Sequence, residues 1–110
     1  MKGSRGYAIV LVTVPGLKVG RTIARALLMS RVAACVNIVP GLESHYWWQG
    51  RMEKSNELLL LIKTERGKLK SLETRLLDVH PYDTPEFLVL PIETGNQRYL
   101  EWLSASLTGG

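Results

Sequence analysis

The amino-acid sequence predicts an α+β domain in which an antiparallel sheet carries two helices on one face. The main observation is the order of the segments: four strand-like and two helical stretches follow one another as βαββαβ, and a third helical stretch ends the chain. The second observation is a hairpin much longer than the other elements. The third is length, because 110 residues suffice for one hydrophobic core but not for two. We therefore expect residues 1–110 to form a single domain.

The first strand and the first helix are marked by a change in hydrophobic period. Tyr7–Val14 is apolar at nearly every position and has the length of a strand, and a Pro-Gly pair follows it. The next stretch, Lys18–Arg31, places apolar side chains on one helical face, as at Val19, Ile23 and Leu27. This stretch is therefore expected to be a helix.

The long hairpin occupies residues 33–64. Its outgoing strand, Ala33–Trp48, is interrupted at Pro40, which cannot donate to a strand ladder and so marks a bulge or a free edge. The turn is Gln49–Arg51, whose central glycine suits the positive φ of a hairpin tip, and the return strand ends in Leu58–Thr64. At about 3.3 Å per residue, the outer half of this arm should project well beyond a compact body.

The second half of the chain repeats the alternation of helix and strand. Lys68–Val79 has a helical apolar stripe, and the His-Pro pair after it stops the helix because a residue before proline avoids the helical region. Phe87–Glu93 is the fourth strand, and Thr94–Asn96 is a turn. Asn96 is suited to cap a last helix over Gln97–Leu107. The complete order is that of a ferredoxin-like sheet with a C-terminal helix added.

The sheet is expected to be apolar on both faces. Apolar side chains occupy odd and even positions alike in three strands, Tyr7–Val14, Leu58–Thr64 and Phe87–Glu93. In a sheet with one solvent-exposed face, apolar and polar side chains should alternate along each strand. Two helices cover only one face, and a bare patch of that size is unusual on a soluble monomer. We expect the C-terminal helix to cover part of the second face and another subunit to cover the rest. The aromatic residues of the arm, Tyr46–Trp48, should also lie on a neighbour.

Composition and charge exclude several classes of protein. The net charge is +4, but basic and acidic residues are interspersed, so we expect no nucleic-acid groove. No apolar run approaches the length of a membrane span, so no membrane insertion is expected. One cysteine excludes an internal disulfide and fits a reducing compartment. Lys2 and Arg5 before an apolar run imitate a signal peptide, but no small-residue cleavage site follows, so we expect a cytoplasmic protein.

The segment from His80 to Glu86 is the first candidate site. Its two prolines stiffen the loop, so His80, Tyr82, Asp83 and Glu86 have defined directions. One interpretation is structural, with a turn at Asp83 and Thr84 and the histidine hydrogen-bonded to backbone. The other is functional, since an imidazole and carboxylates in a cleft can bind a divalent cation or polarise a small ligand.

Further candidates lie in the hairpin, and each has two interpretations. Cys35 is either a small buried apolar residue or a soft copper ligand. Lys63 ends an apolar run, and it either extends its charge into solvent or binds an anion. Trp47 and Trp48 are adjacent and therefore point to opposite faces, as interface anchors or as a wall on which a ligand stacks. His45, beside Tyr46, is expected to be a surface residue.

Enzyme motifs are absent from the sequence. It contains no Gly-rich phosphate loop, no G-x-S-x-G, no H-E-x-x-H and no C-x-x-C, and no general base stands beside an obvious nucleophile. We therefore expect a protein that is not an enzyme.

Several separate motifs follow one another along the chain: Ala33–Asn37, Ser44-x-Tyr46-x-Trp48-x-Gly50, Leu61–Thr64, His80–Tyr82, Pro85-Glu86 and Tyr99-Leu100-x-Trp102. Together and in this order, they resemble the CutA family of divalent-cation tolerance proteins. The resemblance extends from about Ala8 to Leu107 and implies a tight trimer whose long arms wrap neighbouring subunits.

The resemblance also implies a role in metal tolerance, with copper(II) as the ion. By position, His80 is the best metal candidate and Cys35 a weaker one. The chain departs from copper-binding members in having Val12 where some have a cysteine and Val79 where they have a second histidine. It also has Asp83 where Glu or Gln is common, so a copper site here should have fewer protein ligands. No metal is expected to be required for folding.

A second hypothesis is a signalling or scaffold module similar to the trimeric PII-type proteins. In that case a cleft between subunits, lined by Trp48, Lys63, Tyr82 and Glu86 with Asp83 nearby, would take a small anionic ligand, and metal would have no physiological role. Partners would then be other copies of the chain and an unidentified protein.

Overall fold

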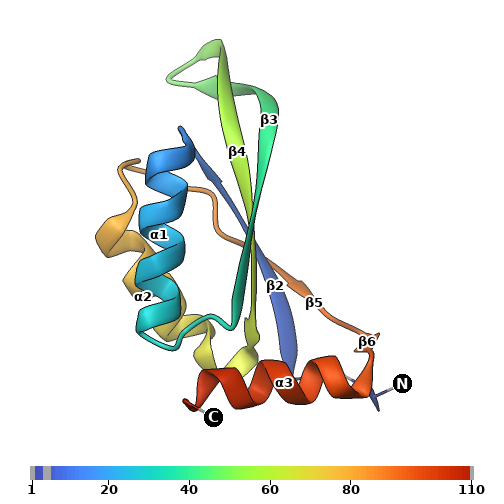
Figure 1. Ribbon diagram of the computed structural model, residues 1–110. Helices are drawn as coiled ribbons and strands as arrows, with labels where there is room; N and C mark the ends of the chain where they lie inside the picture. The colour runs from blue at the N-terminus through green and yellow to red at the C-terminus, as the bar shows by residue number, and fades with distance from the viewer. Residues whose placement is uncertain (1, 4–5, 110) are drawn as a thin grey trace.

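A computed structural model describes residues 2–3 and 6–109 of the chain. A four-stranded antiparallel sheet in the order β3-β4-β2-β5 carries α1 and α2 on one face, and α3 lies across one end (Figure 1). The elements in chain order are β1 Lys2–Gly3, β2 Tyr7–Val14, α1 Leu17–Met29, β3 Cys35–Trp48, β4 Arg51–Glu65, the 3-10 turn η1 Arg66–Lys68, α2 Leu69–Val79, β5 Leu88–Pro91, β6 Thr94–Gly95 and α3 Gln97–Leu107. The α+β class and the antiparallel sheet predicted from the sequence are confirmed.

Several element boundaries differ from the sequence-based expectation, and three of these differences have a structural cause. The first helix ends at Met29, because Ser30 leaves the helical region and Arg31 has a positive φ of 57°. The last strand of the sheet is shorter than Phe87–Glu93 and ends at Pro91, which has no N–H to donate. The turn expected at Thr94–Asn96 is wrong in part, because Thr94–Gly95 forms β6 and pairs with Lys2–Gly3. Two-residue strands carry no period, so sequence alone could not reveal this pair.

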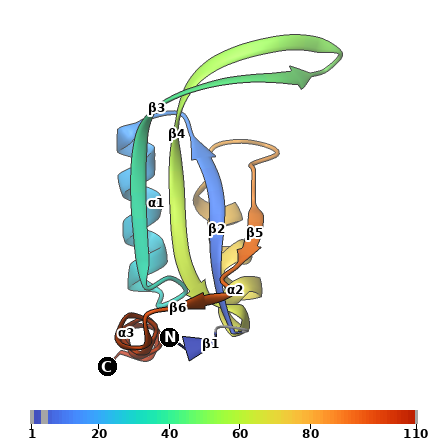
Figure 2. The ribbon, with the colours of Figure 1, turned by 90° about the vertical axis from the view of Figure 1, so that its right-hand side faces the viewer.

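The hairpin has the predicted interruption and the predicted tip. The pairing register of β3 and β4 shifts between Val39 and Leu42, around the Pro40–Gly41 pair. At the tip, Gln49 and Gly50 have φ of 50° and 77°, as a tight hairpin turn requires. Beyond the bulge, the outer halves of β3 and β4 curve over the end of β2 and over the loop that leads to β5 (Figure 2). A bulge bends a strand, which accounts for the curvature at this point.

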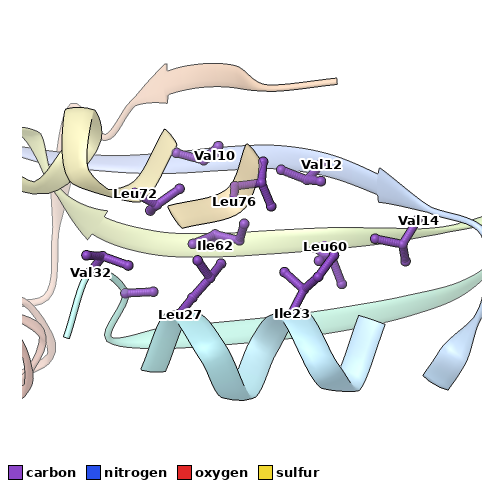
Figure 3. Close-up of a cluster of buried hydrophobic side chains, with 11 residues drawn as sticks. Val10, Val12, Val14, Ile23, Leu27, Val32, Leu60, Ile62, Leu72 and Leu76 are labelled. Atoms are coloured by element: carbon purple, nitrogen blue, oxygen red, sulfur yellow. The ribbon is translucent and has the colours of Figure 1, made fainter. Parts of the chain in front are cut away.

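The main core lies between the sheet and the helices α1 and α2. Val10, Val12 and Val14 of β2 and Leu60 and Ile62 of β4 are fully buried and point at the helices (Figure 3). The helices meet them with four buried side chains, Ile23 and Leu27 of α1 and Leu72 and Leu76 of α2. These are the positions that share one face when a strand is read with period two and a helix with period 3.6.

The second face of the sheet is covered only at one end. There α3 buries Leu100, Leu103 and Leu107 against Tyr7, with Ala34 and Ile92 at the margin. The expectation that the C-terminal helix covers part of this face is therefore confirmed. The uncovered part, called here the open face, consists of the half-buried Ile9, Leu11, Leu59 and Leu61 and the exposed Val39, Leu88 and Leu90.

None of the helices in the described part of the chain is long and apolar enough to cross a bilayer.

Candidate functional site

A cavity of about 880 Å³ lies where the curved arm faces the loop between α2 and β5. Volumes of this size are typical of small-molecule sites. Its lining residues are Thr13, Ser44–Trp48, Glu57 and Pro81–Glu86. We call this cavity the arm pocket. It contains three carboxylate residues and no lysine or arginine among its described lining.

One wall of the arm pocket is a single face of the β3–β4 arm. Alternate residues of a strand share a face, so Ser44, Tyr46 and Trp48 of β3 lie on the same side as Glu57 of β4, which is paired with Leu42. Ser55, on this same face, donates a hydrogen bond to the hydroxyl of Tyr46 at 3.3 Å. The bulge at Pro40–Gly41 turns this face toward the loop.

Glu57 is the most deeply buried acidic residue of the arm pocket, with only 7% of its surface exposed. The hydroxyl of Tyr82 donates a hydrogen bond of 2.7 Å to its Oε2. Burial, and then this bond to a charged acceptor, raise the pKa of the Tyr82 phenol well above its ordinary value. Tyr82 therefore remains protonated and acts as a fixed donor to Glu57.

Glu86 is the second carboxylate that matters for the charge of the pocket. Burial raises the pKa of Glu86 above its ordinary value, and the negative charge of Glu57 adds to the effect. A proton or a bound cation lowers the repulsion between two carboxylates that are both partly removed from water. The pocket is therefore suited to positive ligands.

His80 is buried behind the loop and holds it in place. Its Nε2 lies 2.8 Å from the backbone oxygen of Thr13, and its Nδ1 accepts a hydrogen bond of 3.1 Å from the backbone N–H of Tyr82. These partners assign the tautomer with the proton on Nε2. Both ring nitrogens are thus engaged with backbone, as in the structural interpretation of this histidine, and a metal would have to displace one of these bonds.

Cys35 and Lys63 lie at the base of the hairpin, away from His80. They are paired across β3 and β4, while Thr13, the partner of His80, is paired with Leu59. Four residues of β4 separate these two points, which is about 13 Å. Within one chain His80 and Cys35 therefore cannot bind the same ion, and Lys63 does not line the arm pocket.

The surroundings of Cys35 and Lys63 confirm this separation. The thiol of Cys35 lies 3.7 Å from Oδ1 of Asn37, on the open face. Lys63 donates a hydrogen bond of 3.3 Å to the hydroxyl of Tyr99 in α3. On the other side of β3, Val36 and Ile38 pack against the helix-covered core. Ala34 precedes β3 and packs at the margin of the α3 cluster.

No cluster of three or more His, Cys, Asp or Glu side chains in metal-binding geometry occurs among residues 2–3 and 6–109. The other histidine, His45, is exposed on the opposite face of the arm from Tyr46. There it contacts Glu43 at 2.8 Å, and Lys54 lies 3.9 Å from the same carboxylate.

Glu57 is the site residue that sequence reasoning missed. It stands directly before the apolar run of β4, at an odd position on the same side as Leu59 and Leu61. A carboxylate that continues an apolar stripe can indicate a site residue in a sequence, because such a group needs a partner when it is buried. That partner, Tyr82, is 25 residues away in the sequence.

The fold and the pocket define a small α+β protein with a projecting hairpin and an acidic, aromatic-lined cavity beneath it. Over residues 8–106 the chain matches the family described as CutA1 divalent ion tolerance protein, and it belongs to that family. The resemblance inferred from the sequence motifs is thereby confirmed.

Individual relatives agree with this assignment. The divalent-cation tolerance protein CutA of Thermus thermophilus is 54% identical over 95 residues, which cover 86% of this chain and 92% of that protein. A chloroplastic CutA 1 of Oryza sativa is 47% identical over 98 residues, 89% of this chain, but the chain spans only 55% of that longer protein. The structure of a periplasmic CutA from Archaeoglobus fulgidus matches with a TM-score of 0.89 and 33% identity, covering 92% of this chain and 98% of that one.

The names of these relatives point to different compartments. One is called chloroplastic and another periplasmic. The cytoplasmic location expected from the single cysteine therefore stays a prediction.

Proposed function

We propose that the protein is a homotrimer that binds divalent cations and takes part in tolerance of such ions. The observation that carries this proposal is the pair of carboxylates in the arm pocket, Glu57 and Glu86, which a dication would neutralise together. The divalent-ion name of its family supports it. In this proposal the protein is a binding protein, not an enzyme, and it acts in the cytoplasm.

Copper(II) is the ion we propose to test first, with His80 as the expected ligand. The donors that face the arm pocket are oxygen atoms of Glu57, Glu86 and Asp83, which suit harder ions such as Mn²⁺ as well. His80 joins them only if its ring leaves Thr13 or Tyr82. Cys35 contributes only through a neighbouring subunit, because it lies at the base of the hairpin, away from His80.

The homotrimer is proposed from the open face and the arm. Leu88 and Leu90 are 54% and 47% exposed, and Trp47 and Met52 at the tip of the arm are 71% and 76% exposed. Apolar surface of this extent is typical of surfaces that another chain covers. Arms that reach beyond the body are suited to pack on neighbours.

The alternative, a PII-like module that takes a small anionic ligand, is less favoured. The described lining of the arm pocket carries three carboxylates and no lysine or arginine, and its one histidine, His45, contacts Glu43, so the pocket disfavours an anion. Lys63 reverses this only if a second subunit brings it to the pocket.

The test is native mass spectrometry with titration of Cu²⁺, Mn²⁺ and Zn²⁺ at pH 7. We expect a trimer that binds about one ion per subunit in the wild type. Glu57→Gln should weaken binding at least tenfold, and Glu73→Gln, a change at an exposed carboxylate of α2, should leave it unchanged. His80→Ala, with an unaltered circular-dichroism spectrum, decides whether the histidine is a ligand.

Each result has a defined meaning. If His80→Ala no longer binds copper but still binds manganese, His80 is a copper ligand. Equal, sub-stoichiometric uptake of all ions by all variants would remove the metal proposal, and a monomer at micromolar concentration would remove the trimer.

A further inference from the structure

We infer that the arm pocket also binds an organic cation that carries N–H donors, a protonated primary amine or a guanidinium group. The cation would lie against Tyr46, Trp48 and Tyr82, with its nitrogen directed at Glu57 and Glu86. This inference goes beyond metal binding and does not depend on it, although both use the same pocket.

The free oxygen of Glu57 is the first observation. An ionised carboxylate has about four acceptor positions on its two oxygens. Among the described residues, Tyr82 is the one side-chain donor to Glu57, and it reaches Oε2 only. No buried side-chain oxygen of the described residues lacks a partner, so Oε1 of Glu57 is open to the cavity that this largely buried side chain lines. A ligand with an N–H group would supply a donor to this oxygen.

The aromatic wall is the second and independent observation. Tyr46 and Trp48 share the face of the arm that carries Glu57, and Tyr82 faces them from the loop. Tyr46 is close enough to Tyr82 to contribute to its raised pKa. Aromatic faces attract cations within about 6 Å, and they attract organic cations in particular because these shed water more readily than a metal ion does.

A second group of aromatic residues in the molecule shows how a cation can be accommodated. At the other end of the sheet, Tyr99 and Trp102 pack with ring centroids 5.4 Å apart, and Lys63 Nζ lies 5.5 Å from the centroid of Tyr99. There an internal lysine fills the cationic position. In the arm pocket the described lining includes aromatic and acidic side chains but no lysine or arginine.

Size and shape agree with a small organic ligand. A volume of about 880 Å³ exceeds the needs of a single metal ion and lies within the range of small-molecule pockets. The backbone of the arm wall is held by the β3–β4 ladder, and the loop wall is held by His80 through Thr13 and Tyr82. The pocket is therefore largely formed before a ligand enters.

The experiment compares 2-phenylethylammonium with 2-phenylethanol, a neutral analogue of almost the same shape. Binding is followed on the full chain at pH 7 in metal-free buffer by two-dimensional ¹H–¹⁵N NMR. The three tryptophans give separate indole N–H signals, so Trp48 reports on the pocket and Trp102 in α3 is an internal control. We expect saturable shifts at Trp48 with the ammonium and at least tenfold weaker binding of the alcohol.

Two variants and their matched controls locate the interaction. Glu57→Gln should weaken binding of the ammonium at least tenfold, and Trp48→Leu about fivefold. Glu73→Gln and Trp102→Leu, at exposed positions outside the pocket, should leave it unchanged. The comparison of charged and neutral probes uses the wild type, so it remains decisive if a variant does not fold.

Equal binding of the two probes, or equal shifts at Trp48 and Trp102, would overturn the inference. So would the absence of any shift at Trp48, which would mean that a neighbouring subunit already fills the pocket. The metal titration separates this failure from that of the proposed function. Uptake of divalent ions that needs Glu57, without binding of the ammonium, leaves the metal proposal standing alone.

Discussion

The two faces of the sheet are equally apolar in sequence but differ in burial. Leu60 and Leu61 are adjacent leucines in β4, and each has a β2 side chain opposite it. Leu60 faces α1 and α2 and is fully buried, whereas Leu61 faces the other way and is only half-buried. The sequence pattern of these residues is the same, and what differs is the element that lies over each face.

The two faces of the sheet therefore have different roles, one in the stability of the chain and the other in binding. The helix-covered face stabilises the chain by itself, since its leucines and valines already touch buried partners. The open face, together with the arm, offers apolar surface and the arm pocket to another molecule. Three substitutions test this difference between the two faces.

The largest effect is expected from Leu60→Ala, with Leu61→Ala as its matched partner. Removing a fully buried leucine leaves a cavity, so Leu60→Ala should lower the free energy of unfolding by about 2–5 kcal/mol. Leu61→Ala should cost less than half as much at concentrations where the protein is dissociated, because its side chain is already partly in water. Urea denaturation of both variants checks this. Equal losses in dilute solution would show that the two faces do not differ in the isolated chain.

A smaller effect is expected from Tyr7→Phe, at the end of the sheet that α3 covers. Ser104 donates a hydrogen bond of 2.9 Å to Glu65, so its Oγ accepts the hydroxyl of Tyr7 at 2.7 Å. Loss of this bond should destabilise the protein by about 1 kcal/mol, seen as a lower midpoint in urea. Tyr99→Phe, which removes an exposed hydroxyl, is the control and should have almost no effect.

The smallest effect is expected from Glu86→Gln, and it depends on pH. The raised pKa of Glu86 means that the folded chain binds this proton more tightly than the unfolded chain. The contribution of the protonated Glu86 carboxyl to folding stability is therefore complete below its ordinary pKa of 4.5, and it is lost as the pH rises through the raised pKa. At pH 7 the Glu86→Gln variant should melt at a higher temperature than the wild type. The difference between the two melting temperatures should become smaller toward pH 4. Calorimetry at the two pH values tests this, and a gap that widens on acidification would contradict the assignment.

Part of the candidate site could be predicted from the sequence. The stiff loop after His80 and the aromatic arm were both identified, because proline pairs and neighbouring aromatic residues are visible in a linear pattern. Glu57 was not, since its importance comes from Tyr82, a residue of another element. Lys63 was grouped with Tyr82 and Glu86, but the direction of β4 carries it to the far end of the sheet.

Local sequence patterns are sufficient to predict the elements, the bulge in the hairpin, the cap at Asn96 and the apolar character of both sheet faces. The cap is formed as expected, since Oδ1 of Asn96 accepts the N–H of Tyr99 at 3.0 Å. These features depend on neighbours in the chain, on residue shape and on hydrophobic period. Long-range packing determines which face α1 and α2 cover, where the curved arm meets the loop, and which carboxylates share a pocket. These depend on contacts between residues far apart in the chain, and hydrophobic period carries no information about which element lies opposite.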